Sequence, residues 1–96
     1  MSKGNNMQKL FIDYELQDGT SGSARILAAD KIRFETAARA NSWPIEDGPR
    51  AMSIMLFASL KRTKAIDCTY EDFVADQLAD FAINRDSEND DENPTR

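Results

Sequence analysis

Apart from Phe11, apolar and polar residues alternate over residues 8–16, which is the pattern of a β-strand with one face on a core. The apolar positions are Leu10, Ile12, Tyr14 and Leu16. Asp18-Gly19 follows at once, and this dipeptide favours the positive φ angles of a tight hairpin turn. Residues 22–28 then form a weaker returning strand. Because an isolated hairpin is marginally stable in water, we expect this one to pack against helices.

Three helical segments follow the predicted hairpin. The first begins at the N-cap Asp30 and is stopped by Pro44. The second covers residues 49–62, with Pro49 at its first position, where the missing N–H costs nothing. The third begins after the N-cap Thr69, and its apolar residues repeat at i, i+3 and i+4. These residues are Tyr70, Phe73, Val74, Leu78, Phe81 and Ala82. The predicted fold is a small α+β domain, an N-terminal β-hairpin followed by three α-helices.

The 96 residues suffice for one domain. We expect residues 1–7 to be disordered, residues 8–85 to fold, and residues 86–96 to form a disordered acidic tail. The tail carries five acidic residues against Arg96, so most of the net charge of −5 belongs to it and the folded part is almost neutral.

The second predicted helix has almost no polar side. From Ala51 to Leu60 every residue except Ser53 and Ser59 is apolar. One interpretation is a central core helix that the rest of the chain covers. The other is that part of this helix meets a second copy or an apolar partner, because methionines suit adaptable binding surfaces. The predicted partner-binding residues are Met52, Met55, Leu56, Phe57 and Leu60.

Few residues suggest catalysis or metal binding. The chain has no histidine, and its one cysteine, Cys68, has no partner at zinc-site spacing. Asp72, Asp76 and Asp80 would share one face of the third helix, which favours a solvated face over a weak calcium site. We therefore predict no enzymatic activity, no cofactor and no metal.

The acidic balance argues against nucleic-acid binding. The N-terminal residues contain no apolar signal core, and the apolar run of residues 51–60 is about half the length that a membrane span needs. A helix-turn-helix regulator stays an alternative, because residues 30–62 hold two helices joined by a short turn. Its phosphate contacts would be Arg33, Arg39 and Arg50. A small phage structural subunit is another alternative.

Five short motifs occur in a fixed order along the chain. They are Asp18-Gly19-Thr20, Trp43-Pro44, Leu60-Lys61-Arg62, Tyr70-Glu71-Asp72-Phe73 and Pro94-Thr95. In this order, over residues 8–96, the chain resembles the short form of the tail assembly chaperones of long-tailed phages, especially those of actinobacterial phages.

This resemblance implies a non-enzymatic function. The short protein and a frameshifted long form of it would coat the tape-measure protein, keep it soluble and help to recruit tail-tube subunits. The resemblance also implies a homo-oligomer made late in infection, located in the host cell cytoplasm and absent from the mature virion.

Overall fold

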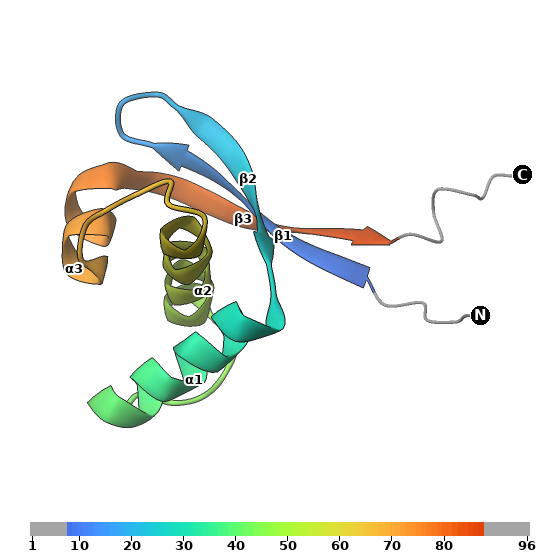
Figure 1. The fold of residues 1–96 in the computed structure, drawn as a ribbon, viewed down its shortest axis with the longest axis vertical. Coiled ribbons are helices and arrows are strands. Elements are labelled where there is room, and N and C mark those ends of the chain that lie inside the picture. Colours follow the sequence, from blue (N-terminus) through green and yellow to red (C-terminus); the bar gives the residue numbers. More distant parts are fainter. Residues whose placement is uncertain (1–7, 88–96) are drawn as a thin grey trace, which may run out of the picture.

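The computed structural model describes residues 8–87, which form an antiparallel three-stranded sheet with helices on one side (Figure 1). The strands are β1 (Gln8–Leu16), β2 (Ser21–Ile26) and β3 (Leu78–Ser87), in the spatial order β2-β1-β3. The helices are α1 (Ala28–Asn41), α2 (Pro49–Arg62), the short α3 (Tyr70–Asp72) and the π-helical segment η1 (Phe73–Gln77). The disorder predicted for residues 1–7 and for most of the acidic tail falls outside the described residues. Residues 86 and 87, which were assigned to that tail, belong to β3.

The fold is a small α+β domain, but the predicted arrangement of a hairpin followed by three helices is wrong. The third helical segment ends at Gln77, and the chain then continues as a ten-residue strand that pairs with β1. The physical reason lies in β1, which is the central strand and has a second edge whose backbone groups need partners. A third strand also gives the marginal hairpin the partner that it needs.

The predicted hairpin is confirmed. Leu10 pairs with Ile26 and Tyr14 with Gly22 across β1 and β2. In the turn, Gly19 has a φ of 92°, a conformation that few residues other than glycine adopt at low cost. The Thr20 N–H donates to Asp18 Oδ1 at 2.9 Å and holds the turn closed.

The pairing of β1 with β3 covers the full length of both strands. Ile83 lies opposite Ile12, and Phe81 lies opposite Tyr14. The register shifts between Glu15 and Leu16, where β3 begins. At the other end Gln8 lies opposite Ser87, so the two ends of the described chain are neighbours.

Helix α1 begins slightly earlier than predicted. Leu27, not Asp30, is its N-cap residue. Asp30 is in the first turn, where its Oδ2 accepts a hydrogen bond from the Leu27 N–H at 2.8 Å. A carboxylate in the first turn still satisfies a free N–H and complements the helix dipole. At the other end Ser42 adopts a left-handed conformation, with a φ of 59°, and stops the helix before Pro44.

Helix α2 has the predicted bounds, and the start of α3 is also as predicted. The Thr69 side chain accepts a hydrogen bond from the Asp72 N–H at 3.1 Å, the arrangement of an N-cap. The helical turns of α3 and η1 carry Phe73 into the core, where it is fully buried.

Candidate partner-binding surfaces

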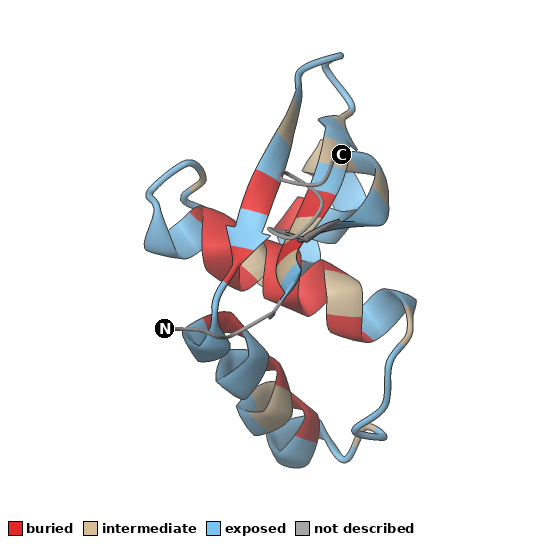
Figure 2. Cartoon of the chain, turned by 90° about the vertical axis from the view of Figure 1, so that its right-hand side faces the viewer, coloured by how far each residue is buried: buried red, intermediate tan, exposed pale blue. Residues whose placement is uncertain are grey.

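Helix α2 is covered mainly by its own chain. Eight of its fourteen residues are buried, and Figure 2 shows buried positions along most of its length, whereas α1 is largely exposed. Three of the five predicted partner-binding residues belong to the core: Leu56 is fully buried, and Leu60 and Met55 are almost so. The apolar character of α2 therefore follows from its place in the core and gives no separate indication of a partner.

The other two predicted contact residues, Met52 and Phe57, are half-buried. They are five positions apart, which corresponds to about 140° around a helix, so they lie on different sides of α2. The Phe57 ring also packs against the rings of Tyr70 and Phe73, with centroids 5.7 Å and 5.8 Å away. Of the five predicted contact residues, Met52 and Phe57 keep the most accessible area, and they do not form one continuous patch.

The two serines of α2 are buried because each finds a hydrogen-bond partner. Ser53 Oγ lies 2.7 Å from the Tyr70 hydroxyl, which connects α2 to α3. Ser59 Oγ donates to the Arg25 carbonyl of β2 at 2.9 Å. The two serines therefore bond α2 to α3 and to β2, so their polar groups are satisfied although they are buried.

An ion pair between the buried Asp30 and the more exposed Arg62 joins the start of α1 to the end of α2. Asp30 is 1% exposed, and its two oxygens accept hydrogen bonds from Arg62 Nη2 at 2.8 Å and Nε at 3.2 Å. The hydrogen bond to Asp30 raises the pKa of Arg62. A cavity of about 300 Å3 lies beside this pair, with Arg33 and Lys61 also at its wall. Because Arg62 is bonded to Asp30, we assign this pair the structural role of connecting α1 to α2.

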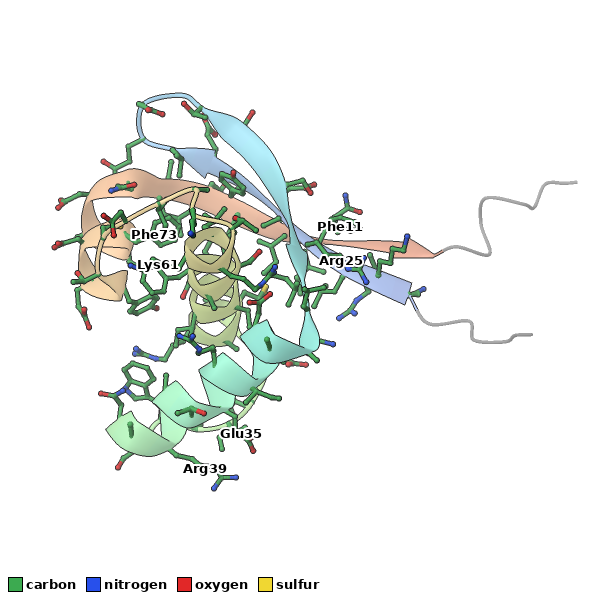
Figure 3. The ribbon with its side chains drawn as sticks, in the orientation of Figure 1. Phe11, Arg25, Glu35, Arg39, Lys61 and Phe73 are labelled. Atoms are coloured by element: carbon green, nitrogen blue, oxygen red, sulfur yellow. The ribbon has the colours of Figure 1, made fainter. Side chains whose placement is uncertain are left out.

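The three arginines considered as phosphate contacts do not form one basic surface. Arg39 pairs with Glu35 at 3.0 Å along the exposed side of α1, as Figure 3 shows. Arg50 stacks on the Trp43 ring, 4.2 Å from its centroid. Helix α2 would be the recognition helix of a helix-turn-helix motif, yet most of it is buried and unable to enter a DNA groove.

The predicted row of carboxylates does not form. Asp72 is in α3, Asp76 in η1 and Asp80 in β3, so no single helical face carries them. Among residues 8–87 no group of three or more acidic or cysteine side chains is placed to hold a metal ion. Cys68 is a half-buried free thiol. None of the helices in the described region is long and apolar enough to cross a bilayer.

The surface that the sequence analysis missed is the outer edge of β3. Within residues 8–87 no strand pairs with this edge, because β3 is the last strand of the sheet. Ile83 is 38% exposed and Phe81 is half-buried, although both lie on the same side of the sheet as the fully buried Ile12. The Phe81 N–H donates to the carboxylate of its own neighbour Asp80 at 2.8 Å. An exposed edge that carries apolar side chains is a template for another strand.

The opposite face of the sheet is polar and internally bonded. Asp13 of β1 accepts hydrogen bonds from Ser23 of β2 at 2.7 Å and from Asn84 of β3 at 3.3 Å. Arg25 lies over the Phe11 ring on this face, 5.8 Å from its centroid (Figure 3). These contacts satisfy the face within one chain, which leaves the edge of β3 as the more open apolar feature of the sheet.

Comparison with known proteins adds no assignment. No protein-family model matches the chain, and neither a curated protein nor a solved structure matches it.

Proposed function

We propose that this protein is a tail assembly chaperone of a long-tailed phage, which binds the tape-measure protein and keeps it soluble while the tail is built. The observation that carries the proposal is the ordered set of short motifs that resembles this family. Four of the five motifs lie within the described residues, and each lies at the end of a helix or strand or in the turn beside it.

The motif residues have identifiable structural roles. Gly19 makes the hairpin turn, and Trp43 stacks on Arg50 where the loop enters α2. Arg62 joins α2 to Asp30 of α1, and Phe73 fills the core beneath α2. These motif residues therefore help to specify the fold of the chain, and the proposal rests on their order along the sequence.

The described surface offers several separate apolar contacts. Large apolar side chains are exposed on the loops, on α1, on η1 and on β3: Leu27, Ile32, Ile45, Val74 and Ile83. Weak contacts of this kind gain strength when many copies bind along one long client. The proposed partners are the tape-measure protein, a frameshifted long form of this chain and the tail-tube protein. The proposed location is the host cell cytoplasm, with the protein absent from the mature virion.

The coding DNA gives the first test. A slippery heptamer near the last codons, an overlapping open frame and a long helical gene downstream are expected. If these features are missing, no frameshifted form and no adjacent client exist, and the proposal fails.

Co-expression gives the direct test. The tape-measure protein from that downstream gene is produced alone and together with this chain, and its soluble fraction is measured. We expect this chain to raise the soluble fraction and to co-purify with the client with little dependence on salt, because the contacts are apolar. An equal soluble fraction in both cultures contradicts the proposal. Binding to DNA that weakens steeply with added salt would instead indicate a regulator.

A further inference from the structure

We propose that the outer edge of β3 pairs with the β3 strand of a second copy, antiparallel and two-fold symmetric, to give a continuous six-stranded sheet. This inference concerns the chain's own association and does not depend on the proposed chaperone function. It rests on which edge of the sheet is open, which backbone groups face outward and which register suits the side chains.

The two edges of the sheet differ. The β2 edge is partly occupied, because the Arg25 carbonyl accepts hydrogen bonds from Ser59 at 2.9 Å and from Arg62 at 3.2 Å. The chain also passes from β2 directly into α1, which lies at the end of that strand (Figure 1). The β3 edge is ten residues long, and in the described part of the chain no strand covers it. A partner strand therefore has one favourable place to dock.

The outward backbone groups of β3 belong to Phe81 and Ile83. The Arg25 carbonyl points away from β1, and opposite residues of an antiparallel pair either bond to each other or both face away. Phe11, which is opposite Arg25, therefore directs its backbone groups toward β3, and its partner there is Asn84. The backbone N–H and C=O groups of Asn84 thus point toward β1, and those of Ile83 point away from it. The hydrogen bond from the Phe81 N–H to the Asp80 side chain agrees, since a free outward N–H needs such a partner.

Symmetry restricts the possible registers. In a two-fold antiparallel pair, opposite residues have side chains on the same face, so residues of equal parity must meet. With Ala82 at the axis, Phe81 meets Ile83 of the second copy, and Asp80 meets Asn84. With Ile83 at the axis, Phe81 meets the charged Arg85 of the second copy in place of an apolar side chain, which is less favourable. The register centred on Ala82 places aromatic and aliphatic side chains opposite one another, and it is the register that we propose.

This pairing also explains the exposure of Ile83. Ile12 in the neighbouring strand is fully buried, yet Ile83 directly opposite it is 38% exposed. The helices cover β1 and leave the rim of the apolar layer open at β3. A second β3 would place Phe81 beside Ile83 on this rim from both copies. Asp80, which blocks the Phe81 N–H in the single chain, would release it to the Ile83 carbonyl of the second copy.

The first experiment measures mass against concentration by light scattering. An interface made by two paired strands is small, so the association should be weak. We expect the average mass to rise from 10.8 kDa toward twice that value as the protein concentration increases over about 10–500 µM. Ile83→Pro removes the outward N–H and should keep the chain monomeric with its circular dichroism unchanged. The control is Val74→Lys. Val74 is an exposed apolar residue on η1, away from the proposed interface, so this substitution should leave the dimer intact.

The second experiment tests the register and does not depend on how proline is tolerated. Ala82→Cys with Cys68→Ser brings two thiols together at the proposed axis, within the Cα separation that a disulfide requires. Oxidised glutathione should convert this variant to a covalent dimer at a rate at least about tenfold above Asn84→Cys with Cys68→Ser. In the control variant the two thiols are separated by four residues along the strands, about 13 Å.

The possible outcomes separate the occupants of the edge. A monomer at all concentrations, together with equal cross-linking of the two cysteine variants, overturns the proposal. A dimer that Ile83→Pro leaves intact places the interface elsewhere and also overturns it. A monomer that binds the tape-measure protein, and loses this binding with Ile83→Pro, would assign the edge to the client in place of a second copy.

Discussion

Replacing Leu56 with alanine tests whether α2 is core or contact surface. Leu56 is fully buried in α2, so the substitution removes buried methyl groups and leaves a cavity. A change of this kind costs about 2–5 kcal/mol of unfolding free energy. A chain of 96 residues has a total stability of about 5–14 kcal/mol, so the loss is a large share of it. For a domain of this size the midpoint of thermal unfolding should fall by about 8–40 °C.

The assay is urea unfolding at constant temperature, followed by circular dichroism and by the fluorescence of the single tryptophan, Trp43. The slope with urea should stay constant while the midpoint falls, which identifies a change in stability. Ile32→Ala is the matched control, because Ile32 is 60% exposed on α1, and its cost should stay within about 0.5 kcal/mol. A loss below about 1 kcal/mol for Leu56→Ala would show that Leu56 is not enclosed and would refute the core assignment of α2.

Three further predictions concern the turn, a helix cap and acid stability. Gly19→Ala should destabilise the chain by about 1 kcal/mol or more, because φ is 92° there, and a loss near zero in urea unfolding would contradict the turn geometry. Thr69→Ala should cost about 1 kcal/mol through the lost hydrogen bond to the Asp72 N–H, whereas Thr69→Ser should retain most of the stability. The hydrogen bond from the Thr20 N–H lowers the pKa of Asp18 below its usual 3.8, so its contribution to stability is present above that pH and is lost as the pH falls through the lowered value. Asp18→Asn should therefore flatten the fall in stability below about pH 4, and an unchanged pH profile would show that the turn makes no such contribution.

Local chemistry made much of the fold predictable from the sequence. The Asp18-Gly19 turn, the Pro49 start of α2 and the Thr69 cap each depend on residues close together in the chain. The position of Asp30 at an N-terminus was also evident, although its exact place in the first turn was not, because a carboxylate stabilises either position.

Strand β3 could not be recognised in this way. The apolar residues from Tyr70 to Ala82 fit a helical repeat, and Phe81 and Ile83 alone fit a strand alternation. What turns Leu78–Ser87 into a strand is its pairing with β1, about 70 residues away in sequence. Tertiary pairing outweighs local preference here. The one available signal was that the predicted hairpin needed further support.

The choice of α2 as the partner-binding element depended on the same predicted topology. With only a hairpin and two other helices around it, α2 has few neighbours to cover it, and the prediction therefore includes Leu56 and Leu60 among the contact residues. The third strand and the buried Phe73 enlarge the domain enough to enclose them. Ser53 and Ser59 are buried in α2, and their hydrogen bonds to Tyr70 and to the Arg25 carbonyl help to cover the helix.

The pairing of Gln8 with Ser87 has a consequence for engineering the chain. Since the two ends of the described chain are adjacent, a short glycine-serine linker can join them, and new termini can be opened at the exposed turn of Asp18 and Gly19. A circularly permuted protein of this kind should keep the same sheet. By the same geometry, the described chain enters β1 and leaves β3 at one pole of the molecule, at the end of the sheet away from the Asp18-Gly19 turn.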